Sequence, residues 1–283
     1  MKIKSFYHPV TYTLSYVVFD ENTKDAVIID SVLDYDNKGS TLGVKSADIL
    51  LDFVRSEELN VHYLLETHAH ADHLSAASYL KKSLPKAKMA IGSGITEVQK
   101  IFKGLFQVNN DTTGADFDEL LEDGQVFKAG SLELKAISTP GHTPACMTFV
   151  ANDEAAFTGD LMFAPDNGTG RCDFPGGSSE QMYNSIANKV YNLSDNVQVY
   201  PGHDYQPGGR MVWEHASLKE HREANIHITK ETTKEQFQSF RDGRDSGLAA
   251  PMLLLQSVQF NAWAGKLFNE ENPLLHIPLR IKE

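Results

Sequence analysis

One seven-residue segment, Thr67–His73 (THAHADH), constrains this chain more than any other feature of its sequence. Its metal-competent side chains are His68, His70, Asp72 and His73. Imidazole suits zinc and iron, and a carboxylate adds a hard oxygen ligand. Because only 11 of the 283 residues are histidine, three histidines within six positions are improbable by chance. We therefore expect this segment, called the histidine loop below, to bind a metal ion.

The residues on either side of the histidine loop predict regular structure. Val61–Glu66 is apolar and of strand length, and Leu74–Leu84 has helical spacing that ends at Pro85. The loop thus connects the end of a buried strand to the start of a helix. Functional residues are commonly found in such loops.

Three further segments repeat this arrangement, in which a predicted strand ends and one potential ligand follows. They are Thr139–Pro144 (TPGHTP) with His142, Phe157–Asp160 (FTGD) with Asp160, and Tyr200–Tyr205 (YPGHDY) with His203. Each is a weak signal when taken alone, because an aspartate after glycine is more often a turn or cap residue and a lone loop histidine is usually solvated. Together with the histidine loop, the four segments predict one shared metal pocket.

Strand and helix patterns alternate along the rest of the chain. The predicted strands are Thr11–Phe19, Ala26–Asp30, Met89–Gly92, Gln125–Phe127, Leu132–Ser138, Met147–Ala151, Ala155–Thr158 and Gln198–Tyr200, and the predicted helices are Lys45–Glu58, Ile95–Phe106 and Ser179–Asn192. We expect an exposed loop at Asn109–Asp123, a charged helical region at 213–244 and an irregular tail at Met252–Ile281. Two sheets packed face to face, with helices outside, would satisfy this order.

Composition argues against several classes of protein. The formal charge of -12 and the pI of about 5.4 disfavour binding to a phosphate backbone, so we expect no nucleic-acid partner. No apolar run approaches the roughly 18 residues of a membrane span, and no secretory signal is apparent. Cys146 and Cys172 form no disulfide framework and suit a reducing compartment. We therefore expect a cytoplasmic protein that does not contact membranes.

The order HxHxDH, PGH, TGD and GH over about residues 10–205 resembles the metallo-β-lactamase fold. The resemblance implies an α/β protein, an αββα four-layer sandwich with its active site at one edge between the two sheets. It implies a single domain over 1–283, with a helical and irregular C-terminal extension from about 213 to 283. Of the two metal sub-sites in that family, one would be His68, His70 and His142, and the other Asp72, His73 and His203, with Asp160 between the metals.

Several other elements narrow the resemblance to the bacterial persulfide dioxygenases. They are Gly170–Phe174 (GRCDF), His203–Tyr205 (HDY), Pro140–Cys146 (PGHTPAC) and a tail with Arg241, Arg244, Pro251 and Gln259–Gly265, although the tail matches imperfectly. The resemblance implies that glutathione persulfide and O₂ are converted to sulfite and glutathione. The sequence does not determine the oligomeric state, and a homodimer is compatible with it.

The same resemblance assigns a role to each candidate residue. One Fe(II) per chain would be held by His68, His142 and Asp160, which leaves coordination positions open for substrate and O₂. His70, Asp72, His73 and His203 would support these ligands or hold a second metal. Tyr205 could donate a hydrogen bond to oxygen or substrate. Arg171 suits a glutathione carboxylate, unless it forms a structural salt bridge with Asp173 or Asp166. Zinc or manganese can replace iron during heterologous expression.

A thioester hydrolase like glyoxalase II is the main alternative, with two zinc ions activating a bridging water. Against it, Asp204 stands where that family typically has glutamate, and Leu74–Ala77 lacks its usual Gly-Gly. A β-lactamase would normally carry an export signal. A non-catalytic metal-binding or redox-sensing protein would be expected to lack ligands, and none is missing here.

Two cysteines and two further histidines lie outside the predicted set of ligands. Cys146 begins an apolar strand and is expected to be a small buried hydrophobe, whereas Cys172 follows an arginine that could lower the pKa of its thiol. Iron chemistry requires neither thiol. His215 and His221 are expected on the solvated face of a charged helix.

Overall fold

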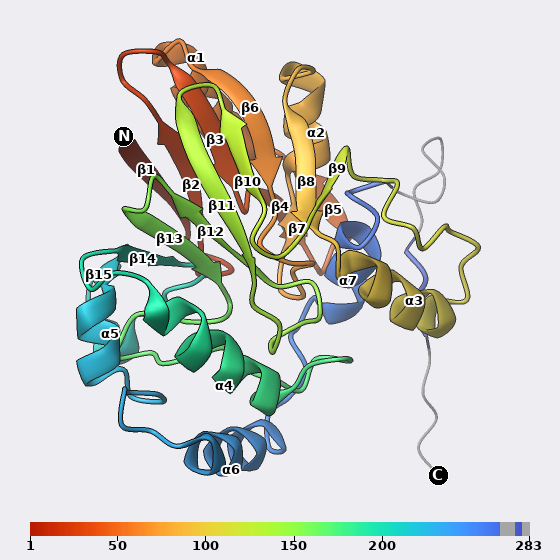
Figure 1. Ribbon diagram of the computed structural model, residues 1–283. Helices are drawn as coiled ribbons and strands as arrows, with labels where there is room; N and C mark the ends of the chain where they lie inside the picture. Colours follow the sequence, from red (N-terminus) through yellow and green to blue (C-terminus); the bar gives the residue numbers. More distant parts are fainter. Residues whose placement is uncertain (267–274, 279–283) are drawn as a thin grey trace.

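A computed structural model describes residues 1–266 and 275–278. Two six-stranded sheets form its centre (Figure 1). The first sheet has the order β1 (Lys2–His8), β2 (Thr13–Phe19), β3 (Asp25–Ile29), β6 (Asn60–Leu65), β8 (Lys88–Gly92), β9 (Glu119–Leu121). The second has the order β10 (Val126–Ala129), β11 (Leu132–Ser138), β12 (Met147–Ala151), β13 (Ala155–Gly159), β14 (Gln198–Pro201), β15 (Ala216–Ser217). A small sheet contains β5 (Thr41–Gly43), β4 (Val32–Asp36) and β7 (Leu74–Ser75).

Strand β2 shows why the two sheets pack face to face. All seven of its side chains are buried, and they alternate between two cores. Leu14, Tyr16 and Val18 belong to the core between the sheets, which also contains residues of β11, β12 and β13. Val17 and Phe19 belong to a core shared with the helices on the other face. A strand covered on both faces lies inside a layered protein.

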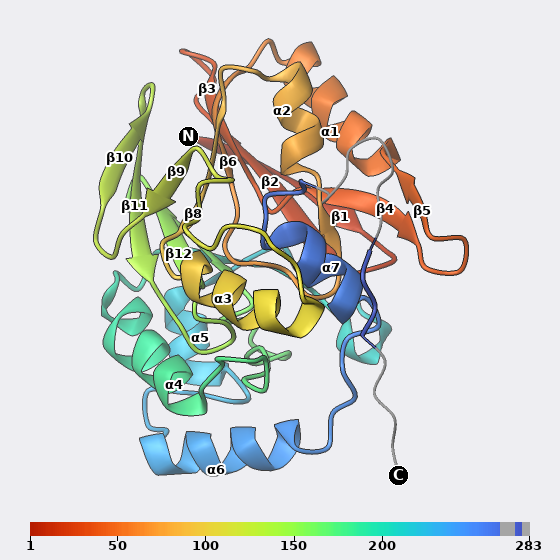
Figure 2. The same cartoon turned by 90° about the vertical axis from the view of Figure 1, so that its right-hand side faces the viewer.

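Helices form the two outer layers (Figures 1 and 2). Those packed on the first sheet are α1 (Lys45–Ser56), α2 (Ala77–Ser83), α3 (Ile95–Phe106) and α7 (Leu254–Asn261). Those on the side of the second sheet are α4 (Ser179–Asn188), α5 (Leu218–Ala224) and α6 (Lys234–Asp245), together with the short 3₁₀ turn η1 (Val190–Asn192). A second 3₁₀ turn, η2 (Pro207–Gly209), follows β14. The predicted αββα sandwich is therefore confirmed.

The two sheets are joined at one edge of the sandwich. The backbone N–H of Met147 in β12 donates to the carbonyl of Thr67, which follows β6, at 2.8 Å. Thr13 of β2 forms an isolated bridge with His203, which follows β14. These contacts bring the strand ends that carry potential ligands to the same edge.

Two predicted elements differ from the structure in the first half of the chain. The expected helix Leu74–Leu84 begins only at Ala77, because Leu74 and Ser75 pair with Leu33 and Val32 of β4 instead. The expected exposed loop Asn109–Asp123 contains β9, whose Leu121 is fully buried at the edge of the first sheet. In both places tertiary pairing overrides local propensity.

The C-terminal part also differs from its prediction. The region 213–244 is not one helical stretch, because it contains β15 and the separate helices α5 and α6. His221 is buried instead of solvated, and this burial lowers the pKa of its imidazole to about 4. The expected irregular tail contains α7, while 267–274 and 279–281 lie outside the described residues. That the whole chain is a single domain stays a prediction.

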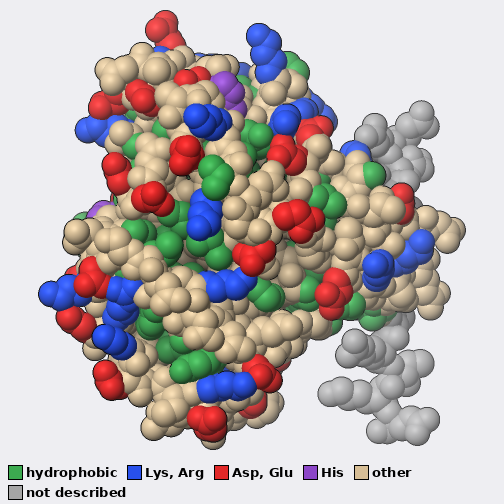
Figure 3. All heavy atoms as spheres, viewed as in Figure 1, with side chains coloured by type: hydrophobic (Ala, Val, Ile, Leu, Met, Phe, Trp, Pro, Cys, Tyr) green, Lys and Arg blue, Asp and Glu red, His purple; other side chains and the backbone are tan. Residues whose placement is uncertain are grey.

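Among the described residues, no helix combines the length and apolarity that a bilayer span requires. On the face shown in Figure 3, acidic and basic side chains lie among one another. The expected absence of a nucleic-acid partner stays a prediction.

Candidate metal centre

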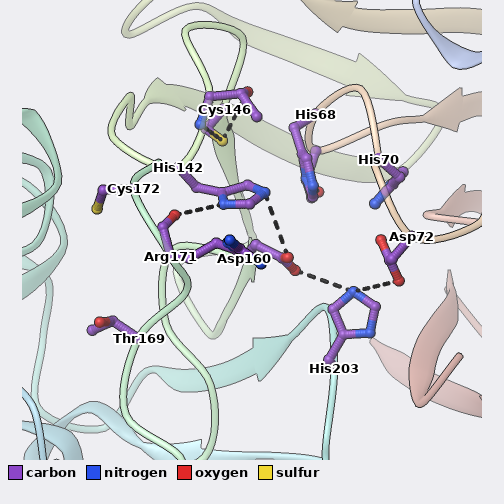
Figure 4. A network of polar contacts seen from close by, with 12 residues as sticks. His68, His70, Asp72, His142, Cys146, Asp160, Thr169, Arg171, Cys172 and His203 are labelled. Carbon is purple, nitrogen blue, oxygen red and sulfur yellow. Dashed lines mark hydrogen bonds and ion pairs between the residues drawn. The ribbon is translucent and has the colours of Figure 1, made fainter. Parts of the chain in front are cut away.

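The four predicted segments place their polar side chains around one space (Figure 4). His68 follows β6, His142 follows β11, Asp160 follows β13 and His203 follows β14. All four residues are buried. The Nε2 atom of His142 lies 3.6 Å from Oδ2 of Asp160, and Nε2 of His203 lies 3.3 Å from Oδ1 of the same carboxylate. We call the space between them the metal pocket.

Three groups of side chains in the described part of the chain are compact enough to hold a metal ion. They are His68, His142 and Asp160; His70, Asp72 and His73; and Asp30, Glu66 and His70. Within each group the potential ligand atoms all lie within 4.8 Å of one another. The first group is the two-histidine, one-carboxylate set expected to hold iron.

Unpartnered buried atoms indicate that the pocket fits a cation. The atoms around the pocket that form no hydrogen bond are His68 Nε2, His70 Nδ1, His73 Nε2, His203 Nε2 and Asp160 Oδ1. A buried polar atom without a partner is costly, and each unsatisfied group needs an explanation. Imidazole nitrogens and a carboxylate oxygen gathered around one space are a suitable donor set for a transition metal.

The other ring nitrogen of each histidine is held by the protein. His142 Nδ1 lies 2.7 Å from the carbonyl of Arg171, and His203 Nδ1 lies 3.2 Å from that of Thr11. A carbonyl can only accept, so Nδ1 carries the proton in both rings. The Nε2 lone pair of each ring therefore faces the metal pocket, as a ligand requires.

His68 is oriented through a chain of three groups. The Thr67 hydroxyl donates to Asp30 Oδ2 at 2.7 Å, so its oxygen accepts from His68 Nδ1 at 3.0 Å. Asp30 also lies 3.1 Å from Nε2 of His70, which leaves Nδ1 of that ring facing the metal pocket. One buried carboxylate thus orients two histidines of the loop.

The electrostatics of the pocket act in opposite directions on its histidines. Burial opposes a charge on His70, but Asp30 and Glu66 outweigh it and raise the pKa of that ring well above its ordinary value. Burial, followed by the neighbouring His70 and His142, lowers the pKa of His68 well below its ordinary value. Burial and His70 likewise lower the pKa of His73 to about 4. Burial also opposes a charge on His203, but Asp72 and Asp160 outweigh it and raise the pKa of that ring. Neutral imidazole is the form that binds metals.

The close approach of the strand ends requires glycine. Gly159 ends β13 with φ +51°, and a Cβ atom there would lie 2.3 Å from the Thr67 hydroxyl oxygen. At Gly202, a Cβ atom would lie 2.8 Å from Oδ1 of Asp160. The glycines of the TGD and PGH segments therefore allow the ligands to converge.

Tyr205 lies beside the metal pocket and remains 46% exposed. Its ring stacks on His203 with centroids 5.5 Å apart, and it also contacts Phe163 and Tyr12. Partial burial of the phenol, then the charges of Asp160 and Asp72, raises the pKa of Tyr205 well above its ordinary value. The hydroxyl therefore stays protonated and can donate a hydrogen bond.

Arg171 forms a salt bridge with Asp173, the alternative to a role in substrate binding. Its Nε and Nη2 atoms each donate to Asp173 at 2.5 Å, and Nη1 donates to the Ala249 carbonyl at 2.7 Å. Asp166 pairs with Arg210 instead. Arg171 nevertheless lines a cavity of about 190 Å³ that reaches His142. Its other lining residues are Ala71, Asp173, Phe174, Pro175, Leu248, Ala250, Pro251 and Leu254.

Neither cysteine has the environment of a reactive thiol. Burial raises the pKa of Cys146 to about 12. Burial also raises the pKa of Cys172, so the lowering expected from the preceding arginine is wrong. Arg171 directs its donors to Asp173 and Ala249, and no hydrogen bond joins it to the Cys172 thiol.

Sequence reasoning missed three buried residues that contact the histidine loop. Asp30 and Glu66 flank Nε2 of His70 at 3.1 and 3.3 Å, and Asn261 of α7 hydrogen-bonds the loop backbone. The acidic residues ended predicted apolar strands, and that position was the one available signal. Asn261 lies in the segment Gln259–Gly265 that contributes to the resemblance, but the sequence assigned it no role, because it lies far from the loop in sequence.

Comparison with known proteins agrees with the fold and the pocket. A family model described as the metallo-β-lactamase superfamily matches residues 8–203. The chain belongs to this superfamily, and its relatives support the prediction that it is an enzyme.

The names of individual relatives indicate two different activities. Glyoxylase B2 of Dictyostelium discoideum is 42% identical over 98% of this chain and 96% of its own length. Human mitochondrial persulfide dioxygenase ETHE1 is 31% identical over 80% of this chain and 76% of its own length. The crystal structure of ETHE1 from Myxococcus xanthus matches with a TM-score of 0.75 and 26% identity, covering 94% of this chain and all of that one.

Proposed function

We propose that this protein is a glutathione-dependent persulfide dioxygenase with one Fe(II) per chain. Glutathione persulfide, O₂ and H₂O would give glutathione, sulfite and two protons. The sulfur–sulfur bond breaks, the terminal sulfur is oxidised to sulfite, and O₂ is the oxidant. The observation that carries the proposal is the compact set of His68, His142 and Asp160.

This set of ligands suits the proposed chemistry. When bound by two histidines and one carboxylate, Fe(II) retains open coordination positions at which a persulfide and O₂ can meet. The protein fixes the ring of His142 through the Arg171 carbonyl and that of His68 through Thr67. His203 and Asp72 lie on the other side of Asp160, with His203 Nε2 3.3 Å from both carboxylates. They would orient Asp160 and a water molecule.

The cavity beside His142 is the proposed site for glutathione persulfide. Its walls are mostly apolar, with Phe174, Pro175 and Leu254 among them, so a bound thiol tripeptide would exclude water from the reacting sulfur. Arg171 supplies the cation for a glutathione carboxylate, which would share the guanidinium with Asp173. Tyr205, at the side of His203, would donate a hydrogen bond to the substrate or to oxygen.

Similarity to persulfide dioxygenase ETHE1 supports this proposal. The more similar relative named Glyoxylase B2 supports a second candidate, a binuclear thioester hydrolase. One structural observation also favours the second candidate. His70 Nδ1, His73 Nε2 and His203 Nε2 form no hydrogen bond, like His68 Nε2 and Asp160 Oδ1 of the iron set, so donors for a second metal are present.

One parallel assay separates the two candidates. Purified protein loaded with Fe(II) is given glutathione persulfide in an oxygen electrode, and protein loaded with Zn(II) is given a glutathione thioester. We expect oxygen uptake with one sulfite formed per O₂, and no appreciable thioester hydrolysis. Thioester turnover by the zinc protein, without oxygen uptake by the iron protein, would make the hydrolase the better proposal.

A further inference from the structure

The C-terminal helix α7 places one polar side chain directly against the histidine loop. Asn261, the last residue of α7, is 5% exposed. Its Nδ2 donates to the carbonyl of His70 at 2.8 Å and to that of His73 at 2.7 Å. Its Oδ1 accepts from the backbone N–H of Ser75 at 2.8 Å. Both amide hydrogens and the amide oxygen are thus used on a six-residue stretch.

This stretch has little secondary structure of its own. Residues 67–73 form neither helix nor strand, so their buried carbonyls need partners from elsewhere. Asn261 satisfies the carbonyls on both sides of Ala71 and Asp72. It therefore fixes the backbone from which His70, Asp72 and His73 project toward the metal pocket.

A second contact links the same stretch to the ring of His70. The Ser75 hydroxyl donates to Oε1 of Glu66 at 2.6 Å, and Oε2 of Glu66 lies 3.3 Å from Nε2 of His70. Asn261 holds the Ser75 backbone, and the Ser75 side chain holds the carboxylate beside the ring. Removing the side-chain amide of Asn261 would therefore disturb both the backbone and the ring of His70.

Helix α7, which ends at Asn261, lies beside α3 (Figure 2). Val258 and Phe260 are buried in the core that contains α3. Gln99 of α3 donates to the carbonyl of Ala262 at 2.9 Å, and the fully buried Trp263 donates to the carbonyl of Asp111 at 2.8 Å. These contacts hold Asn261 on both sides, so it can serve as a fixed support.

We infer that Asn261 is a positioning residue for the metal centre, supplied from outside the 8–203 region that matches the superfamily model. It touches neither the metal pocket nor its ligand atoms, and it acts by holding the backbone of the histidine loop. The inference rests on the metal-binding part of the proposed function, and it requires neither iron nor a persulfide substrate.

The test compares metal binding by two variants of α7. Gln259→Ala is the matched control, because Gln259 is also buried and uses both its amide NH₂ and its amide oxygen. It makes two side-chain hydrogen bonds where Asn261 makes three, and both are with the backbone of His276. Affinity for Co(II) is measured by chelator competition, and the Co(II) absorption spectrum reports the ligand geometry. Thermal unfolding of the metal-free proteins measures the purely structural effect of each change.

We expect Asn261→Ala to weaken Co(II) binding about 10- to 100-fold and to alter the absorption bands. Gln259→Ala should leave the Co(II) affinity within about twofold of wild type and the absorption bands unchanged. This should hold even if Gln259→Ala lowers the melting temperature as much as Asn261→Ala does. Equal losses of affinity in the two variants, or an unchanged affinity in Asn261→Ala, would overturn the inference.

If Asn261→Ala does not fold, an isosteric variant tests the positioning role of Asn261 instead. Asn261→Asp keeps an acceptor for Ser75 but replaces the donating NH₂ by an oxygen that faces two carbonyls. It should weaken Co(II) binding at least as strongly as the alanine variant. Co(II) binding equal to that of wild type would overturn the inference. Because the assay contains no persulfide and measures only Co(II) binding, its result is independent of whether the enzyme is a dioxygenase.

Discussion

Each histidine at the metal pocket has two nitrogens with different tasks. In His142 and His203 Nδ1–H donates a hydrogen bond to a backbone carbonyl, and in His68 it donates to the hydroxyl oxygen of Thr67. Nε2 forms no hydrogen bond in His68 and His203. Ring orientation is therefore set before a metal binds, which reduces the entropy lost when the centre assembles.

The guanidinium of Arg171 provides a test at the scale of single residues. Arg171→Ala should raise KM for glutathione persulfide about tenfold with little change in kcat, because a charge-assisted hydrogen bond contributes roughly 1.5 kcal/mol. The carbonyl that holds His142 belongs to the backbone and is kept in this variant. Asp173→Asn should lower KM, since it frees the guanidinium for substrate. Steady-state oxygen uptake measures both, and an unchanged KM in Arg171→Ala would leave Arg171 as a structural ion pair only.

Strand ends are the elements that build the centre. The strands β6, β11, β13 and β14 each end at the same edge of the sandwich and are followed by a ligand-bearing turn.

At the opposite end of β3 and β6, Asp25 accepts hydrogen bonds from His62 at 2.6 Å and from the N–H of Ser131 at 2.9 Å. This carboxylate ties the first sheet to the β10–β11 turn of the second sheet.

Asp25 gives a prediction on stability and pH. The hydrogen bond from His62, followed in this direction by that from Ser131, holds the pKa of Asp25 below its ordinary value, although burial opposes this. The stabilisation is therefore present above the unfolded pKa of about 4 and is lost as pH falls below it. Asp25→Asn should cost about 1–2 kcal/mol at pH 7, and the difference from wild type should shrink toward pH 3.

Urea unfolding of the metal-free proteins at several pH values measures this effect. Asp52→Asn is the control, because Asp52 pairs with Arg55 on the exposed face of α1 and should contribute less than about 0.5 kcal/mol. A stability difference between Asp25→Asn and wild type that did not depend on pH would contradict the account.

Prediction from sequence succeeded where the local pattern decides the structure. The bounds of α3 and β11 were predicted as observed, because their periodicity reflects burial on one side. Strands β1, β4 and β5 and helix α7 were missed, since long-range pairing and packing determine them. In the site, the ligand-bearing turns were found by their shared motif. Asp30, Glu66 and Asn261 were not, because only the fold brings them to the loop.

The metal centre is assembled from parts of the molecule that are distant in sequence. Both sheets contribute strand ends, α7 supplies Asn261 from beyond the superfamily match, and the segment before α7 lines the cavity beside His142. The same set of potential ligands can be used in two ways. A dioxygenase needs one iron at His68, His142 and Asp160, whereas a thioester hydrolase needs two metals over the whole set.

The number of metal ions per chain tests this central claim most directly. Metal-free protein is titrated anaerobically with Fe(II), bound iron is counted, and each sample is assayed for oxygen uptake with glutathione persulfide. The account predicts that uptake rises linearly and reaches its plateau at one iron per chain. A plateau only at two tightly bound irons per chain, or iron binding without any oxygen uptake, would contradict it.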